Sequence, residues 1–153
     1  MIRRMLVLAG AAGMLVAALA TSVGAAGSDG TITVVERALT DTTVDLGATG
    51  DSLGDMLMFG NPIYDAANAN KIGRDEGSCA RTNPGVAWEC SWTTIVPKSG
   101  SITVQGPFYD DLRDSWLSIT GGTGTYRNAR GQMKLHARNA AGSEFDFVFY
   151  VIG

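Results

Sequence analysis

The stretch Gly121-Gly122-Thr123-Gly124-Thr125-Tyr126-Arg127-Asn128-Ala129-Arg130-Gly131 lies between two runs that are typical of β-strands. The first run is Trp116–Thr120 and the second is Gln132–His136. Glycine at this density marks backbone that takes positive φ values or packs closely against other backbone. The stretch therefore predicts a tight connection between neighbouring strands. A phosphate-binding loop is the alternative, but the Gly-Lys-Ser/Thr ending and a following helix are missing.

Short β-type runs separated by Gly, Asn, Asp and Pro make up most of the chain. In the last run, Phe145, Phe147, Phe149 and Val151 share one face, and the alternate residues share the other. Only two segments, Pro62–Ala69 and Tyr126–Asn128, resemble turns of helix. The pattern predicts a β-sandwich or a β-barrel, and alternation alone does not choose between them. The expected strands are Thr31–Ala38, Thr42–Leu46, Leu53–Phe59, Lys71–Ala80, Val86–Val96, Ser101–Gly106, Ser115–Thr120, Gly131–Arg138 and Ser143–Ile152.

The N-terminus predicts a secretory signal peptide. Arg3 and Arg4 precede an apolar run of about 15 residues, which is shorter than the roughly 20 residues that cross a bilayer as a helix. Small residues favour cleavage after Ala25, with Ala20 as the alternative site. We therefore expect residues 1–25 to be the signal and residues 26–153 to be one secreted, extracellular domain that does not stay inserted in a membrane. A membrane anchor is the alternative interpretation.

Charge and cysteine content narrow the classes of partner. The chain of 153 residues has a formal net charge of −3, and its basic residues are scattered, which disfavours nucleic acid as a partner. Cys79 and Cys90 lie symmetrically about Pro84-Gly85, a turn signal. A hairpin there sets the two cysteines opposite each other, and an oxidising compartment favours a disulfide. Two sulfurs and the single histidine, His136, supply too few ligands for a metal site.

The glycine-rich stretch resembles the Gly-Gly-Thr-Gly-x-Phe-x-x-Ala-Arg-Gly signature of dirigent proteins, and also the corresponding segment of allene oxide cyclases. Further matches to bacterial members of these families follow in order along the chain: Gly54–Phe59, Lys71-Ile72-Gly73, Trp88-Glu89-Cys90 and Gly100–Gly106. The resemblance implies an all-β fold, an eight-stranded antiparallel, calycin-like barrel. Because the related families form trimers, it also suggests a homotrimer.

The resemblance also implies a function. Members of these families bind a hydrophobic small molecule in a dry cavity and steer its cyclisation or stereoselective coupling, with no cofactor and no metal. The expected activity is therefore that of a cofactor-independent cyclase or isomerase. A non-catalytic, lipocalin-like secreted carrier of an apolar ligand is the alternative.

Five residues are candidates for the site. Asp55 shares a strand face with Leu57 and Phe59, and an acid on an apolar face is unusual unless it is paired or functional. Arg130, the arginine of the signature, is its expected partner. Asp55 is either half of a structural pair or a pocket acid, and as the catalytic hypothesis we take Asp55 with Arg130. Tyr64, Trp116 and Tyr126 are the candidate cavity wall, although each is also a plausible core residue.

A second motif suggests a different enzyme. Gly50-Asp51-Ser52-Leu53 matches the motif of a family of serine esterases. Those enzymes need an Asp-x-x-His sequence and a surrounding βαβ unit, and this chain has neither. We therefore interpret Ser52 as a turn residue and His136 as an outward or rim residue of its strand.

Overall fold

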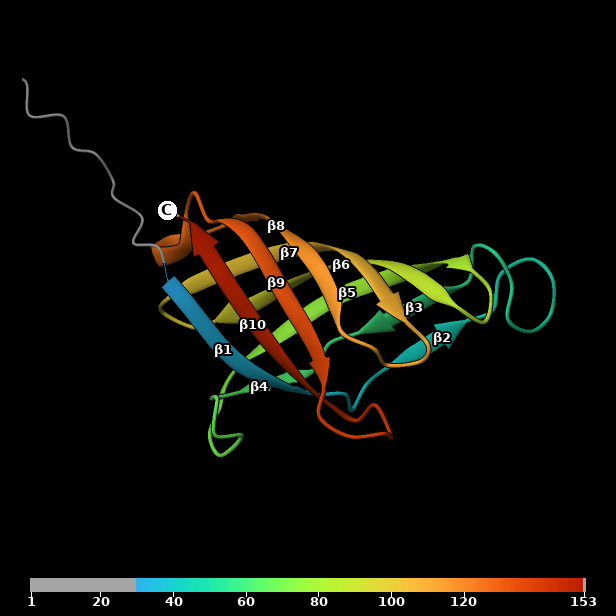
Figure 1. The fold of residues 1–153 in the computed structure, drawn as a ribbon, viewed down its shortest axis with the longest axis horizontal. Helices are drawn as coiled ribbons and strands as arrows, with labels where there is room; N and C mark the ends of the chain where they lie inside the picture. The colour runs from blue at the N-terminus through green and yellow to red at the C-terminus, as the bar shows by residue number, and fades with distance from the viewer. Residues whose placement is uncertain (1–29, 153) are drawn as a thin grey trace, which may run out of the picture.

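A closed β-barrel forms the whole of the described structure, residues 30–152 of a computed structural model (Figure 1). The strand segments are hydrogen-bonded in the order β2-β3-β5-β4-β1-β10-β9-β8-β7-β6, and β6 also pairs with β5, so the sheet closes on itself. All pairings are antiparallel. The segments are β1 (Gly30–Arg37), β2 (Thr42–Val44), β3 (Met56–Phe59), β4 (Pro62–Tyr64), β5 (Lys71–Asn83), β6 (Ala87–Val96), β7 (Gly100–Tyr109), β8 (Ser115–Gly122), β9 (Arg130–Ala137) and β10 (Glu144–Ile152).

Two breaks turn ten segments into the eight strands of the barrel. β3 and β4 both pair with β5 and are separated only by Gly60-Asn61, so they are one interrupted strand. β1 and β2 are likewise consecutive pieces, separated by residues 38–41. The predicted eight-stranded antiparallel barrel is therefore confirmed. Both breaks lie beside the cavity described below.

The alternating pattern decides which side chains form the core. Phe145, Phe147 and Phe149 of β10 point inward and are buried, whereas Tyr150 on the other face is 39% exposed. Fully burying an apolar side chain of this size contributes about 1.5–3 kcal/mol. The inner faces of the remaining strands supply mainly Val, Ile, Leu, Met and Trp to the same core. A period of two residues is thus sufficient to predict this core.

The predicted cysteine hairpin is also confirmed. Cys79 of β5 lies directly across from Cys90 of β6, and the two form a disulfide. The turn between the strands has Gly85 at φ 70°, with a hydrogen bond of 3.0 Å from Val86 N to Asn83 O. The disulfide therefore ties together the two strands whose pairing closes the barrel.

The segment Pro62–Ala69 differs from its predicted helical turn. Residues Pro62–Tyr64 form strand β4, and a turn follows in which Asp65 accepts a hydrogen bond of 2.9 Å from Ala69 N. The prediction was wrong because β4 is only three residues long and its pairing with β1 and β5 is not visible in a local pattern. The second predicted helical turn, Tyr126–Asn128, is placed two residues too late, because the short 3-10 helix η1 spans Gly124–Tyr126 and ends before Arg127.

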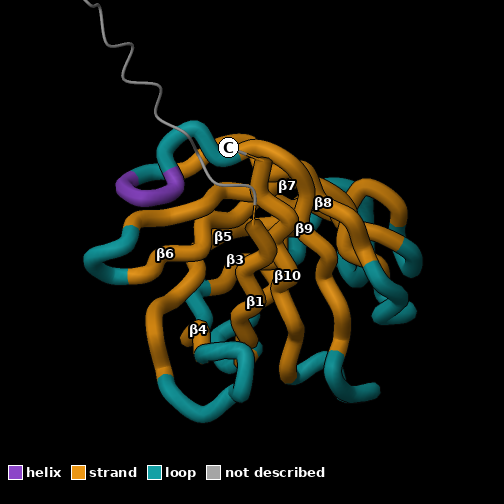
Figure 2. Tube along the Cα trace, turned by 60° about the vertical axis from the view of Figure 1, so that its left-hand side comes forward, coloured by secondary structure: helices purple, strands orange, loops and turns teal. Residues whose placement is uncertain are grey.

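The glycine-rich stretch closes one end of the barrel, where η1 lies near the C-terminus (Figure 2). Thr125 N donates to Ser99 O at 2.7 Å, and Gly124, at φ 60°, sits so close that a Cβ atom there would lie 2.5 Å from Ser99 O. Tyr126 packs against the core from this end. Because backbone packs directly on backbone here, glycine is required, and this end offers little room for a ligand. Among residues 30–152 no helix is long and apolar enough to cross a membrane.

Candidate functional site

A cavity of about 250 Å³ lies in the barrel, toward the end opposite η1. It reaches the surface beside Asp41 and Ala141, which are both exposed. A dry engineered cavity of roughly 150 Å³ binds benzene, so this one has room for a substituted ring or two small fused rings. The lining residues are Glu36, Asp41, Leu57, Phe59, Cys79, Cys90, Trp92, Phe108, Leu112, Leu135, Ala141, Gly142, Phe145 and Phe147.

Glu36 is the acid on the inner wall of this cavity. It follows Ile32 and Val34 on the inward face of β1 and lies opposite Phe145 of β10, with only 6% of its surface exposed. Burial raises the pKa of Glu36 well above its usual range, and the nearby Asp75 carboxylate raises it further. The Glu36 carboxyl group therefore keeps its proton to a higher pH than an exposed glutamate does, and it can act as a donor.

Asp75 lies behind Glu36 and is completely buried. Desolvation raises its pKa as well, while hydrogen bonds from Glu36 and from the backbone of Asn61 oppose that rise. Asn61 N donates to Asp75 Oδ1 at 2.9 Å, whereas Asp75 Oδ2 has no N–H or hydroxyl donor among the described residues. The Glu36 carboxyl is the remaining donor, and it donates only while protonated. The two acids therefore share one proton, held mainly by Glu36.

The side-chain amide of Asn61 fixes the positions of the Glu36 and Asp41 carboxyl groups. Its side-chain amide donates to Glu36 Oε1 at 2.8 Å and to Asp41 Oδ1 at 2.7 Å, and Asn61 is 1% exposed. The side-chain oxygen Oδ1 of Asn61 accepts hydrogen bonds from the backbone N–H groups of Leu39 and Thr40, both at 2.9 Å. The break between β3 and β4 thus supplies a side chain that holds the β1–β2 break and the acid Glu36 in one geometry.

Trp92 contributes a second buried polar group to the cavity lining. It is 5% exposed, and its Nε1 has no hydrogen-bond partner within residues 30–152. Its ring packs against Phe59 at 6.1 Å and against Phe147 at 5.4 Å between centroids. A buried donor without a partner is costly, so an acceptor atom on a ligand would stabilise the occupied site.

Asp55 lies outside this cavity, just before β3. It is 2% exposed, and it accepts hydrogen bonds from Leu46 N at 2.8 Å and from Ser52 N at 2.7 Å. These two backbone donors lower the pKa of Asp55, so the group is a carboxylate rather than a proton donor. The Ser52 hydroxyl donates to Leu46 O at 3.0 Å. Of the two interpretations of Asp55, the geometry therefore favours the structural one, in which it fastens residues 46–52.

The expected pair of Asp55 with Arg130 is not formed. Strand register places Arg130 opposite Ile152, at the η1 end of the barrel. Asp55 lies at the other end, where Asp55 O accepts from Arg81 N at 2.8 Å. The arginine that lowers the pKa of Asp55 by its charge is Arg81. The sequence could not reveal that Asp55 and Arg130 lie far apart. The distance between β3, which follows Asp55, and β9, which begins at Arg130, depends on how the sheet closes.

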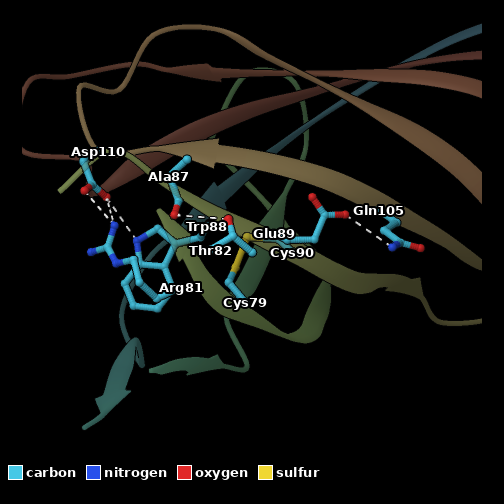
Figure 3. The surroundings of a disulfide bond; sticks show 9 residues. All are labelled: Cys79, Arg81, Thr82, Ala87, Trp88, Glu89, Cys90, Gln105 and Asp110. Carbon is cyan, nitrogen blue, oxygen red and sulfur yellow. Dashed lines mark hydrogen bonds and ion pairs between the residues drawn. A yellow bond between two sulfur atoms is a disulfide. The ribbon is translucent and has the colours of Figure 1, made fainter. Parts of the chain in front are cut away.

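Arg81 belongs to a polar cluster near the disulfide (Figure 3). Its Nη1 donates to both carboxylate oxygens of Asp110 at 2.9 and 2.7 Å, and its guanidinium lies 3.8 Å from the centroid of the Trp88 ring. Trp88 Nε1 also donates to Asp110 Oδ1 at 3.1 Å. On its other side, Arg81 Nε forms an ion pair of 2.6 Å with Asp51. The cluster anchors the residue 46–54 loop to the β5–β6 hairpin.

None of the three expected wall residues lines the cavity. Trp116 is 49% exposed on the outer face of β8, packed against Tyr150 at 5.8 Å. Tyr64 of β4 lies under the guanidinium of Arg37, 3.8 Å from the ring centroid. Tyr126 belongs to the closed end. His136 forms a 2.6 Å contact through Nδ1 with Asp114 and is exposed, as expected for an outward residue.

Sequence reasoning missed Glu36, Asp75 and Asn61. The signal that singled out Asp55 was also present at Glu36, which shares the inward period of Ile32 and Val34. Asp75 gave a weaker signal, because its strand face carries Gly73, Gly77 and Cys79.

The described residues contain no group of three or more His, Cys, Asp or Glu arranged to hold a metal ion.

Comparison with known proteins places this geometry in a family. The sequence model described as allene oxide cyclase matches residues 36–153. The chain belongs to the allene oxide cyclase family. The match begins at Glu36 itself and covers the rest of the barrel.

Solved structures share the family's fold at low sequence identity. A pyocyanin demethylase matches with a TM-score of 0.65 and 24% identity, covering 78% of this chain and 99% of that one. A pterocarpan synthase dirigent protein matches with a TM-score of 0.65 and 12% identity, covering 82% and 97%. The Diels-Alderase AbmU from Streptomyces koyangensis matches with a TM-score of 0.58 and 12% identity, covering 81% and 68%. At these identities the likeness shows the fold, and the predicted resemblance to dirigent and allene oxide cyclase barrels is confirmed.

Proposed function

We propose that the barrel binds a hydrophobic small molecule and steers its cyclisation or stereoselective coupling without a cofactor. The observation that carries this proposal is Glu36, a buried carboxyl group with a raised pKa on the wall of an otherwise largely apolar cavity. Ring-closing substrates of this kind contain their own driving force. The protein then needs only to hold one reactive conformer, exclude water and supply a proton or hydrogen bond.

Each part of that chemistry has a residue in the cavity. The aromatic and aliphatic lining restricts the ligand and keeps water out. Glu36 donates to a carbonyl or phenol oxygen of the ligand, and Asp75 accepts the Glu36 hydrogen bond when the site is empty. Trp92 Nε1 is available as a second donor. A positioned general acid contributes about 10²–10⁴-fold to a rate.

The family gives independent support for small-molecule chemistry. Its matched structures are named as a demethylase, a pterocarpan synthase and a Diels-Alderase, all with the same barrel. The same barrel is therefore compatible with several reactions, and the substrate of this chain depends on the size and lining of its own cavity. At about 250 Å³, that cavity suits one ring with substituents or two small fused rings.

The alternative function is a secreted carrier for an apolar ligand. The observation that favours it is the enclosed apolar lining, which a carrier also needs. Export itself remains a proposal, because the predicted signal, residues 1–25, lies outside the described residues. The homotrimer suggested by the family resemblance is also a proposal.

A small ring-closing probe separates the two functions. The phenol of 2-hydroxyphenyl vinyl ketone adds to its own enone to give chroman-4-one, an isomerisation that needs no cofactor. We expect chroman-4-one to bind with its carbonyl stretch shifted to lower frequency, and the open-chain ketone to cyclise faster than in buffer. Glu36→Gln should remove most of the acceleration, whereas Glu76→Gln, on the exposed outer face, should not. Binding of chroman-4-one without any acceleration of ring closure would favour the carrier.

A further inference from the structure

The charge balance of the cavity lining is one-sided. Glu36 and Asp41 line it, Asp75 lies directly behind Glu36, and none of the described lining residues is Lys, Arg or His. Because Glu36 and Asp75 share one proton, this pair is negative overall, and Asp41 adds a further carboxyl group at the cavity mouth. Any charge on a bound ligand therefore meets a negative field in surroundings of low dielectric constant, where such interactions are strong.

The aromatic side chains favour the same sign of charge. Five lining residues are aromatic: Phe59, Trp92, Phe108, Phe145 and Phe147. They form two packed groups, with Trp92 between Phe59 and Phe147, and Phe108 against Phe145 at 5.9 Å. The face of an aromatic ring attracts cations, most strongly for tryptophan, and recognition of alkylated ammonium groups by aromatic cages uses this attraction.

We propose that the cavity stabilises positive charge on its occupant, so that it binds an aromatic-sized organic cation more tightly than a neutral molecule of the same shape. The proposal rests on the proposed function only in taking this cavity as the ligand site. It also adds to that function. When Glu36 gives its proton to a ligand oxygen, the O–H bond of Glu36 breaks and an O–H bond of the ligand forms. The ligand then carries one more positive charge, which the negative field and the aromatic rings stabilise. The Glu36 carboxylate is stabilised by the cation beside it and by the hydrogen bond from Asn61 Nδ2.

Two molecules of nearly identical shape test the charge preference. Phenyltrimethylammonium carries a positive charge, and tert-butylbenzene replaces its nitrogen by carbon. Binding is measured by calorimetry at an ionic strength of about 0.15 M, where surface charge is screened over about 8 Å. Competition between the two ligands then shows that they share one cavity. We expect the cation to bind about tenfold more tightly, which corresponds to about 1.4 kcal/mol.

Three variants locate the source of the preference. Asp41→Asn removes one charge at the cavity mouth while keeping an acceptor for Asn61, and should lower the affinity for the cation about three- to tenfold without changing that for tert-butylbenzene. Glu36→Gln replaces a protonated carboxyl group by a neutral amide of the same shape, so the negative charge stays on Asp75 and the preference should be kept. Glu76→Gln removes one charge from the exposed face of β5 and should change neither affinity.

The possible outcomes distinguish this inference from the proposed function. If tert-butylbenzene binds as tightly as the cation, the charge preference is wrong and the cavity remains a site for neutral ligands. An unchanged ratio of affinities in Asp41→Asn would overturn the assignment to the carboxyl group at the cavity mouth, and a lost preference in Glu36→Gln would contradict the charge state given to Glu36 and Asp75. If neither molecule binds, the cavity is not the ligand site, and both proposals fail.

Discussion

Replacing Glu36 by glutamine should flatten the dependence of stability on pH above about pH 4.3, the pKa of a glutamate in the unfolded chain. In the wild-type protein, burial raises the pKa of Glu36, so the folded state retains a proton that the unfolded state has released. Glutamine has nearly the same shape, still accepts from Asn61 and still donates to Asp75, but it cannot ionise. The substitution therefore removes the contribution of Glu36 to the proton linkage while leaving the geometry of the cluster in place. Asp75, whose pKa is raised to about 6 by burial, keeps its own contribution.

The sign and size of the effect follow from the raised pKa. Below the unfolded-state pKa of about 4.3, Glu36 is protonated in both states and its burial carries no ionic cost. Above that value the folded state holds about one extra proton, so the free energy of unfolding falls by about 1.4 kcal/mol for each pH unit. The fall continues until the pH passes the folded-state pKa. Asp55, Asp65 and Asp114 have lowered pKa values, so their contributions are lost only at more acidic pH, outside this window.

Urea unfolding at a series of pH values measures this slope directly. We expect wild type to lose stability as the pH rises from 5, while Glu36→Gln loses less, because only Asp75, with a pKa raised to about 6, still releases a proton. Glu76→Gln is the matched control, because that carboxylate is exposed and its variant should retain the wild-type slope. Equal slopes in wild type and Glu36→Gln would refute the shared proton, and with it the role of Glu36 as a neutral donor.

Three further predictions concern residues named from the sequence. Intact mass should show the loss of two hydrogens for the Cys79–Cys90 disulfide. Replacing both cysteines by alanine should lower the free energy of unfolding, measured in urea, by about 2–3 kcal/mol for a loop this short. Two reactive thiols in the unfolded, non-reduced protein would contradict the disulfide. Asp55→Asn should lower the melting temperature and leave the affinity for chroman-4-one unchanged, because Asp55 holds residues 46–52 by hydrogen bonds outside the cavity. Lost affinity at an unchanged melting temperature would instead make Asp55 a ligand-binding residue. Trp116→Ala should leave that affinity unchanged in calorimetry, since Trp116 lies on the outer face; weaker binding would place a second site there.

Most of the fold could be predicted from the sequence because its signals are local. Alternation along β10 separates Phe147 from Tyr150, and the Asn83-Pro84-Gly85 turn sets the two cysteines in register. What local patterns do not contain is the closure of the sheet. The break at Gly60-Asn61 shows its meaning only when β4 is seen to pair with both β1 and β5.

The candidate site was harder to predict for the same reason. Glu36, Asn61 and Asp75 come from three different segments, and their contact depends on the pairing of β1, β4 and β5. Asp55 satisfied the criterion of an acid on an apolar face, but its partners are backbone N–H groups that no sequence pattern identifies. Tyr64, Trp116 and Tyr126 were chosen by residue type, and residue type does not state which side of a barrel a side chain faces.

The stretch that identifies the family and the residues proposed for its chemistry lie at opposite ends of the barrel. At the η1 end, Gly124 and Gly131 bring backbone so close to backbone that a Cβ atom would meet a carbonyl oxygen in each case. Such packing leaves no room for a side chain at either position. At the other end, the two strand breaks leave residues outside regular strand pairing. Asn61 lies in one of these breaks and holds Glu36 and Asp41 at the cavity by hydrogen bonds. The glycine signature therefore marks where backbone packs on backbone, whereas the residues that line the cavity all lie outside it.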